Sequence, residues 1–390
     1  MTQFNPSSYI ADRMKKVPPS GIRRFFDLVS EIDDVISLGV GEPDFVTPWH
    51  IRETCIHSLE QGETAYTSNY GILELREEIC KMYMKRHGVA YDPATEVLVT
   101  TGGSEGIDIA IRSIVNPGDE VIIIQPSFVA YVPSVIFAGG IPVPVSTKME
   151  NNFKLTPEEL KAAITDRTKA IIMNYPNNPT GATMEKSDLE AIADVIVENN
   201  LMVISDEIYE CLTYGGKHTC FSALEGMKER TILLNGFSKS HAMTGFRIGY
   251  ALAAPEIINS MMLIHQYAMM CAPVTGQIGA IEALKHGESE MMKMVREYDR
   301  RRNLIASGLN RIGLECFEPK GAFYAFPSIQ SAGLTSAEFA EQLLNDQRVV
   351  TIPGDSFGEA GTGFIRCAYA ASREDIHRAL DRMEEFLGKL

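Results

Sequence analysis

The sequence has few of the features that are typical of secreted proteins, proteins with a structural metal site or membrane proteins. Its 390 residues include one tryptophan and seven cysteines, and the cysteines are scattered with no C-x-x-C pair. An odd, scattered set argues against a disulfide framework or a structural zinc site. No stretch reaches the ~20 consecutive apolar residues of a membrane-spanning helix, and Met1 to Ile10 lack a basic patch followed by an apolar run. We therefore expect a cytoplasmic protein without a metal site.

Positive charge and the common catalytic motifs are also scarce. Lys and Arg number 36 against 51 Asp and Glu, a net charge of −15, which disfavours general binding to nucleic acid or anionic membrane. The chain contains no G-x-x-x-x-G-K-[ST], no G-x-G-x-x-G after a strand and no H-E-x-x-H. These absences weaken nucleotide and zinc-protease interpretations, and any bound phosphate must occupy a local site.

What the chain does have is ample material for a folded core in two domains. Hydrophobic residues make up 45% and charged residues 22%, which is typical of globular proteins. Short, almost continuously apolar runs alternate with helical patterns; they span residues 96–100, 121–124, 170–174, 201–205, 231–235 and 247–252. Such runs predict a mostly parallel sheet covered by helices on both faces. Beyond residue 313, shorter strands and a final amphipathic helix from Arg373 predict a smaller α+β unit.

The most informative segment, residues 236–250, carries Lys239 between two predicted buried strands. Burial pushes an ammonium toward its neutral form, and a neutral amine is the nucleophile that condenses with an aldehyde. Ser238 and Arg247 add a hydroxyl and a cation that suit a bound phosphate. Lysine, aldehyde and phosphate together indicate pyridoxal 5′-phosphate (PLP).

Three further strand ends offer groups that such a cofactor needs. Asp206 could keep the pyridine nitrogen protonated, Tyr209 could approach the 3′ oxygen of the ring, and the 177–181 turn presents Asn178. The Gly-Gly-Ser turn at residues 102–104 opens a helix, where backbone N–H groups can bind phosphate. Each of these features alone is equally compatible with an ordinary helix cap, a packed aromatic or a turn.

Taken in order along the chain, these segments resemble the class I/II aminotransferases of PLP fold type I. The similarity extends from end to end and is strongest to the bacterial and archaeal subgroup of aromatic-amino-acid, aspartate and N-acetyl-diaminopimelate aminotransferases. The matching segments are residues 20–23, 41–45, 66, 71–76, 101–103, 177–181, 205–209, 238–239, 245–249 and 321–324. The resemblance implies an α/β fold with a mostly parallel seven-stranded sheet flanked by helices. It also implies a large PLP-binding domain (48–285), a small α+β domain (286–390), and an N-terminal segment (1–47) that belongs in part to the small domain.

The resemblance also assigns cofactor-binding roles. Lys239 matches the Schiff-base lysine, Asp206 matches the partner of the pyridinium nitrogen, and Tyr209 and Asn178 match the pair that bonds the 3′ oxygen. Phe128 matches the aromatic residue that stacks on the cofactor ring. The phosphate site corresponds to Gly103, Ser104, Ser238 and Arg247, joined by Tyr66 from the other subunit of a homodimer.

For the substrate, Arg366 matches the arginine that binds the α-carboxylate, assisted by Asn178, Phe128 and the Gly41 backbone. The guanidinium fork fits a carboxylate bidentately, which lysine cannot do. The implied reaction moves an amino group from an L-amino acid to 2-oxoglutarate by a ping-pong mechanism, in which Lys239, Asp206 and Tyr209 are the catalytic residues. A PLP β-lyase and a non-catalytic PLP-binding module are the alternatives from other classes.

The preferred substrate is the open point. The chain lacks an obvious second acid-binding lysine, which favours aromatic or broad specificity over aspartate or N-acetyl-diaminopimelate. Arg23 could meet a distal carboxylate or be a surface arginine, and Tyr267 could form an aromatic wall. Two departures from the family pattern bear on this point. Phe128 and Phe246 stand where many relatives carry tryptophan, and the residue at Ser104 varies between subgroups.

Overall fold

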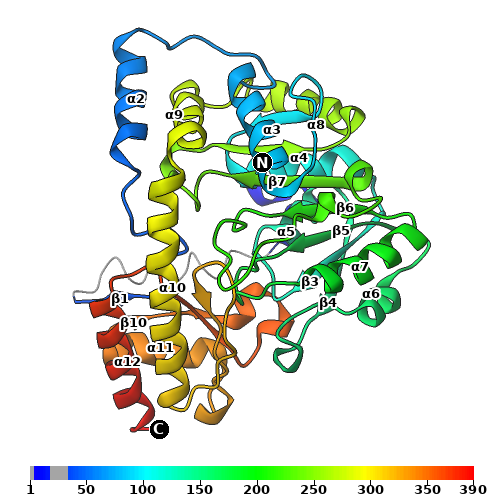
Figure 1. Ribbon diagram of the computed structural model, residues 1–390. Helices are drawn as coiled ribbons and strands as arrows, with labels where there is room; N and C mark the ends of the chain where they lie inside the picture. The colour runs from blue at the N-terminus through cyan, green and yellow to red at the C-terminus, as the bar shows by residue number, and fades with distance from the viewer. Residues whose placement is uncertain (1–3, 18–33) are drawn as a thin grey trace.

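The structure is a computed structural model that describes residues 4–17 and 34–390. Its centre is a seven-stranded sheet in the order β2-β8-β7-β6-β5-β3-β4 (Figure 1). The strands are β2 (Val97–Thr100), β3 (Glu120–Gln125), β4 (Ile141–Ser146), β5 (Thr168–Asn174), β6 (Met202–Asp206), β7 (Thr231–Gly236) and β8 (Gly249–Leu252). Strand β8 runs opposite to the other six strands of this sheet, which are parallel to one another. The predicted mostly parallel α/β fold is confirmed.

Strand β4 was not among the apolar runs that the sequence analysis identified. It contains Pro142 and Pro144, and most of its residues are partly or fully exposed. Proline cannot donate to a β-ladder, so a sequence with two prolines argues against a central strand. The prolines are tolerated here because β4 is the edge strand and pairs only with β3.

Helices cover both faces of the sheet, as the apolar strands require. They are α2 (Trp49–Glu60), α3 (Leu73–His87), α4 (Gly102–Ile114), α5 (Tyr131–Phe137), α6 (Pro157–Ala163), α7 (Lys186–Glu198), α8 (Pro255–Ala268) and α9 (Val274–His286). Side chains of α4, α5 and α8 share one core with Ile172 and Ile204, whereas those of α6 and α7 share another with Ile171 and Val203. Successive strand residues therefore point to opposite helical layers.

The C-terminal part is a smaller α+β unit, with α10 (Glu288–Arg311), α11 (Ser336–Gln347) and α12 (Arg373–Leu387). Its sheet has the order β11-β12-β9, formed by Ile352–Pro353, Ile365–Ala368 and Tyr324–Ala325. Beside it, β1 (Ile36–Ser37) pairs in parallel with β10 (Val349–Val350). This pairing joins the N-terminal segment to the C-terminal unit, which agrees with the proposed division, although its boundaries at 47/48 and 285/286 remain a prediction.

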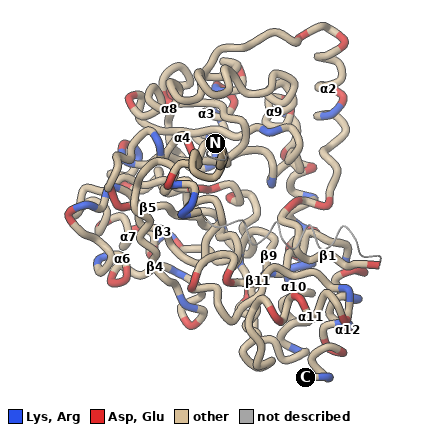
Figure 2. Tube along the Cα trace, turned by 180° about the vertical axis from the view of Figure 1, so that it is seen from behind, with Lys and Arg blue, Asp and Glu red and all other residues tan. Residues whose placement is uncertain are grey.

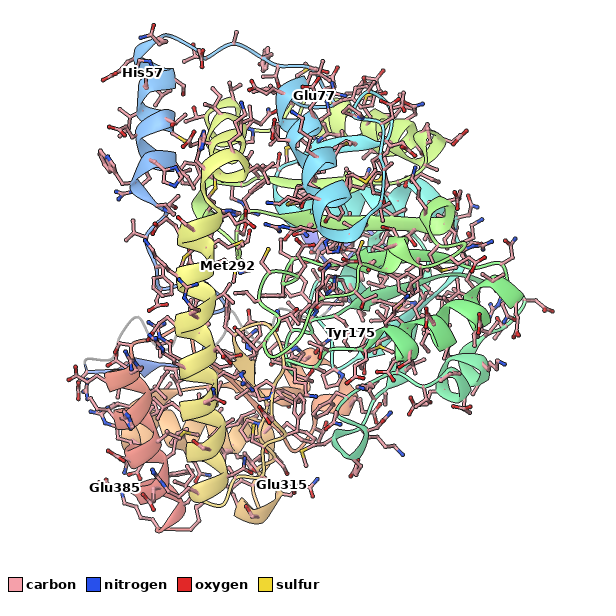
Figure 3. The ribbon with its side chains drawn as sticks, viewed as in Figure 1. His57, Glu77, Tyr175, Met292, Glu315 and Glu385 are labelled. Carbon is pink, nitrogen blue, oxygen red and sulfur yellow. The ribbon has the colours of Figure 1, made fainter. Side chains whose placement is uncertain are left out.

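Two surface features complete the architecture. Basic and acidic residues are interspersed along the chain, and neither sign gathers on one element in the view of Figure 2. Helix α2 packs against α9 and extends away from the central sheet, with His57 near its far end (Figures 1 and 3). None of the helices in residues 4–17 and 34–390 combines the length and apolar character needed to cross a membrane.

Replacing Ile172 by alanine should test how much of the stability comes from the sheet core. Ile172 lies at the centre of β5 and is 1% exposed, so Ile172→Ala should lower the free energy of unfolding by about 2 to 5 kcal/mol in urea denaturation. The control is Val197→Ala on α7, where the valine is 48% exposed and a change below about 0.5 kcal/mol is expected. Equal losses in the two variants would contradict this account of the core.

Candidate active site

A cavity of about 480 Å³ opens where strands β5, β6 and β7 end. Ligands of open α/β sheets bind at this carboxyl edge. Of the predicted site residues, the cavity wall includes Gly41, Gly103, Ser104, Phe128, Asn178, Asp206, Tyr209, Ser238, Lys239, Arg247 and Arg366. Tyr66, which was also predicted to bind the cofactor, does not line this cavity. Residues that lie far apart in the chain are therefore gathered into one site of a size that suits a small-molecule ligand.

Lys239 lies in the loop that follows β7, and its amine is held in place from the opposite side of the cavity. Its Nζ donates a hydrogen bond to the carbonyl oxygen of Gly41 at 2.5 Å. Burial lowers the pKa of Lys239 to about 8, and the positive charges of Arg366 and Arg247 act in the same direction. A substantial fraction of this amine is consequently neutral near physiological pH, as a nucleophile or base requires.

Asp206 ends strand β6 and is buried, with both carboxylate oxygens accepting hydrogen bonds. Oδ2 accepts from the hydroxyl of Tyr131 at 2.7 Å, and Oδ1 accepts from the backbone N–H of Ile208 at 3.2 Å. Burial raises the pKa of Asp206 to about 6, although these two hydrogen bonds oppose the rise. The side-chain amide of Asn174 donates to the Asp206 carbonyl oxygen at 2.8 Å. Asp206 is thus a fixed carboxylate that remains ionised at neutral pH.

Arg366 is fully buried, and part of its guanidinium has no protein partner. NH1 donates to Asn178 Oδ1 at 3.0 Å and NH2 donates to the Gly39 carbonyl oxygen at 2.7 Å. Rings of Tyr324 and Phe357 flank it, with centroids 4.5 and 4.9 Å from Cζ. Within the described ranges, Nε is buried and donates to nothing. Because Arg366 lines the cavity, its buried positive charge suits an anionic ligand group.

Tyr209 is linked to Arg366 by a second tyrosine, Tyr324. Its hydroxyl is 2.8 Å from that of Tyr324, whose ring packs on Arg366. Burial raises the pKa of Tyr209 well above its ordinary value, so its phenol stays protonated. A protonated phenol can donate a hydrogen bond to an oxygen of a ligand in the cavity.

The phosphate end of the site combines a helix start with a guanidinium. Gly102 has φ +76°, and a Cβ at this position would lie 2.5 Å from NH2 of Arg247. Arg247 itself has φ +56°, and its NH1 donates to the Thr244 carbonyl oxygen at 2.9 Å. The glycine is required because the guanidinium occupies the space of a side chain. The N-terminus of α4 and Arg247 therefore form a cradle that fits a phosphate dianion.

Glu105 fixes the geometry of this helix start. One of its carboxylate oxygens accepts a hydrogen bond from the backbone N–H of Thr101. The other lies 2.7 Å from Nδ1 of His265, which is fully buried on α8. The turn that precedes Gly103 is thereby tied to a second helix, so the backbone N–H groups are preorganised for an anion.

Two predicted residues, Tyr66 and Tyr267, do not line the cavity, and Tyr267, the proposed aromatic wall, is 87% exposed. Tyr66 is 80% exposed and lines no part of it within this chain. Its predicted contribution to the site of another subunit remains a prediction. Arg23, like the rest of segment 20–23, lies outside the described residues, so its proposed contact with a distal carboxylate is also untested.

Sequence reasoning missed three residues that complete the site. Tyr131 and Asn174 both hydrogen-bond to Asp206, and Tyr324 packs on Arg366. Asn174 ends a predicted strand beside the 177–181 turn, and Tyr324 lies in the matching segment 321–324. Tyr131 follows Phe128 by three residues. The place of each residue in the sequence was therefore a weak signal that it could belong to the site. It did not indicate which residue it would contact.

A second polar cluster lies behind the turn that carries Asp206 and Tyr209. Ligand atoms of Glu207, Glu210 and His218 all lie within 4.8 Å of one another, a grouping that could hold a metal ion. These atoms already have protein partners: His218 lies 2.6 Å from Glu207, and Arg86 lies 3.0 Å from Glu210. We assign this network to holding the turn, because two buried carboxylates require compensating charge.

Comparison with known proteins identifies the family. Residues 33–383 match the family described as aminotransferase class I and II. The chain is 46% identical to an aromatic-amino-acid aminotransferase of Thermococcus litoralis, over 97% of this chain and 98% of the relative. An aspartate aminotransferase of Pyrococcus abyssi shows the same identity and coverage.

A solved structure gives the same result in three dimensions. The aromatic aminotransferase of Pyrococcus horikoshii OT3 superposes with a TM-score of 0.90 at 45% sequence identity, covering 94% of this chain and 99% of that one. Fold, sequence and the chemistry of the cavity therefore agree. This chain belongs to the class I and II aminotransferases, the PLP-dependent transaminases.

Proposed function

We propose that this aminotransferase moves the amino group of an aromatic or other uncharged L-amino acid to 2-oxoglutarate in a ping-pong reaction. The observation that carries the proposal is the convergence of Lys239, Asp206 and Arg366 on one cavity. Bound PLP supplies an electron sink for the carbon that loses its proton. The chain itself must position the substrate and move that proton.

Lys239 is proposed as the group that moves the proton. Its amine has a pKa of about 8, close to the operating pH, which is where a general base is most effective. As a neutral amine, Nζ accepts the proton from the α-carbon of the substrate, and as an ammonium it returns a proton. The Gly41 carbonyl oxygen, 2.5 Å from Nζ, limits where the amine can go.

Asp206 and Tyr209 are proposed to hold the cofactor in its reactive protonation state. An ionised Asp206 favours a proton on the ring nitrogen, because an opposite charge stabilises the cationic form. The phenol of Tyr209 and the amide of Asn178 are proposed to bond the 3′ oxygen. Ser104, Ser238 and Arg247 are proposed to bind the phosphate, and Phe128 to cover the ring face.

Arg366 is proposed to bind the α-carboxylate together with Asn178. Both residues line the cavity, and the terminal N–H groups of the guanidinium suit a bidentate bond to a carboxylate. Fixing the carboxylate fixes the rotation about the bond between the α-carbon and its nitrogen. The bond to the departing proton would then stand near perpendicular to the conjugated ring system. Orientation of this kind contributes to rate as well as to binding.

The preference for an uncharged side chain rests on the cations of the cavity. Within the described residues its cationic lining consists of Lys239, Arg247 and Arg366, and each is committed to the reaction, the phosphate or the α-carboxylate. Ile107 and Ile208 add apolar wall. A distal carboxylate would thus need a cation from elsewhere, for which Arg23 is the candidate. Aspartate or N-acetyl-diaminopimelate remains the alternative donor.

We further propose a homodimer, in the cytoplasm, with Tyr66 completing the partner's phosphate site. Large hydrophobic side chains are exposed on and near α2 and α8, including Trp49 at 57%, Tyr66 at 80% and Tyr267 at 87%. Exposed large apolar side chains of this kind are typical of an interface. Helix α2, which carries Trp49, stands at the side of the chain beside α9 (Figure 1).

A panel of amino donors tests the reaction and the role of Lys239. With 2-oxoglutarate as acceptor, we expect kcat/KM for phenylalanine or tyrosine to exceed that for aspartate by about tenfold or more, because burying an unpaired carboxylate is costly. Lys239→Ala should lower turnover by at least about a thousandfold. Lys217→Ala, in an exposed loop, is the control and should match wild type. A Lys239→Ala variant with wild-type turnover would refute the assignment.

The pH dependence of PLP capture tests the environment of the lysine. Because only the neutral amine attacks the aldehyde, the rate at which cofactor-free protein captures PLP should rise about tenfold per pH unit and level off above a pH of about 8, the pKa of Lys239. A simple alkylamine titrates near 10.5 and serves as the control, since its rate should keep rising. Parallel profiles for protein and amine would show that Lys239 is not desolvated in this way.

Gly102→Ala tests the phosphate cradle. The new methyl group would collide with Arg247, so PLP affinity measured by absorbance titration should fall by about tenfold or more, the effect of losing a charge-assisted hydrogen bond. Gly62→Ala is a matched control, because Gly62 also has φ +76° but has no atom within 4 Å of the added Cβ. If both variants bind PLP equally well, the crowding at Gly102 is irrelevant to the phosphate.

A further inference from the structure

Tyr131 is a buried residue beneath the cavity to which the proposed reaction gives no role. It is the first residue of α5 and its side chain is 1% exposed. Its hydroxyl donates to Oδ2 of Asp206 at 2.7 Å. Tyr131 does not line the cavity, so it can influence a ligand there only through residues that do, among them Asp206.

The direction of this hydrogen bond is fixed by the chemistry of both groups. An ionised carboxylate can only accept, so the phenol must donate. Burial and the charge of Asp206 raise the pKa of Tyr131 well above its ordinary value, which keeps the donor proton in place. With the N–H of Ile208 on Oδ1, each carboxylate oxygen is held by one donor and retains capacity to accept another from the cavity.

The position of Tyr131 in the chain links two contacts with the cofactor ring. Phe128, proposed to cover the ring face, lies three residues before Tyr131, and the two rings meet edge to face with centroids 5.7 Å apart. Tyr131 thus supports Phe128 on one side and Asp206 on the other. The short 3-10 helix η2 (Asp12–Lys16) contacts α5, so the N-terminal segment abuts the same element.

We infer that Tyr131 is a positioning residue that holds Asp206 in its ionised form and aims it at the ring nitrogen of PLP. The inference rests on the proposed function, in which Asp206 pairs with that nitrogen. The phenol stabilises negative charge on Asp206, so the shared proton stays on the cofactor and the ring keeps its electron-withdrawing charge. Without the phenol, Asp206 becomes a better proton acceptor and the ring loses cationic character.

Other charged groups near Asp206 do not replace this contribution. Burial and the neighbouring Glu207 both disfavour ionisation of Asp206, and the charge of Lys239 favours it only weakly in comparison with the hydroxyl of Tyr131. Tyr209 is held protonated by burial and adds no charge. The hydroxyl of Tyr131 is therefore the largest stabilising influence on the carboxylate, ahead of the Ile208 N–H.

The test compares Tyr131→Phe with wild type in the retention of PLP as a function of pH. The holoenzymes are dialysed across a pH series and the bound cofactor is measured by absorbance. Retention falls when Asp206 is protonated, so the midpoint for Tyr131→Phe should lie about one to two pH units above that of wild type, the effect of a lost hydrogen bond to a charged acceptor. In the half-reaction with an amino donor, the maximal rate should fall about tenfold with little change in KM.

The control is Tyr91→Phe, which removes the hydroxyl of another buried tyrosine. Tyr91 donates to Ser222 Oγ at 2.8 Å and lies in a different core cluster from Tyr131. Its retention midpoint should match that of wild type. Thermal unfolding of both variants without cofactor measures the cost of losing a buried hydroxyl, and equal melting temperatures in the two variants exclude a general loss of folding as the cause of a shift.

The outcomes separate this inference from the function on which it rests. A wild-type protein that takes up no PLP, or that binds it equally well as Lys239→Ala, would remove the proposed function. If wild type binds PLP through Lys239 but Tyr131→Phe keeps the wild-type midpoint and rate, only the role of Tyr131 is overturned. A midpoint shift shared by Tyr91→Phe would likewise overturn it, because the effect would then belong to any buried hydroxyl.

Discussion

Desolvation of one amine and one carboxyl group is the constraint on which this active site depends. Burial destabilises the charged form of each group, so it lowers the pKa of Lys239 to about 8 and raises that of Asp206 to about 6. Between these two values the carboxyl group is already ionised and the amine is becoming neutral. Near neutral pH one cavity can therefore hold a base and an anion together, whereas stronger burial would protonate Asp206 and remove the anion.

The sheet generates this arrangement through alternation and register. Asn174 and Asp206 are paired neighbours on β5 and β6, so both project from the same face of the sheet at its carboxyl edge, toward the cavity. The next residue, Glu207, points to the opposite face, where it binds His218 and the N–H of Phe221. The turn after β6 is thus held from behind while its other side chains serve the site. A fixed backbone is what allows a carboxylate to be aimed at a ligand atom.

Much of this could be predicted from the sequence because the relevant patterns are local. Apolar runs identified most of the strands, and the lysine between two of them indicated aldehyde chemistry before any family resemblance was considered. The role of Arg366 had no local signature and came from the resemblance alone. The edge strand β4 was missed because Pro142 and Pro144 forbid a central strand and say nothing about an edge.

The residues that support the site were harder to predict because their partners are distant in sequence. Tyr131 and Asp206 are 75 residues apart, and only the packing of α5 over the sheet brings them together. A tyrosine at a helix start carries no mark of such a contact, since aromatic side chains are buried for packing in most proteins. Long-range pairs of this kind follow from the assembled layers and not from any one element.

Substrate selection follows from how the cavity distributes its positive charge. The three cationic side chains that line it within the described chain are Lys239, Arg247 and Arg366, and each faces a different part of the proposed complex. An aromatic donor gains from apolar burial against Ile107 and Ile208, whereas a dicarboxylate must desolvate a second charge. The proposed acceptor, 2-oxoglutarate, carries that second charge, so the proposed ping-pong reaction needs a cation that contacts the acceptor and not an aromatic donor. Arg23, which lies outside the described residues, is the proposed source of that cation.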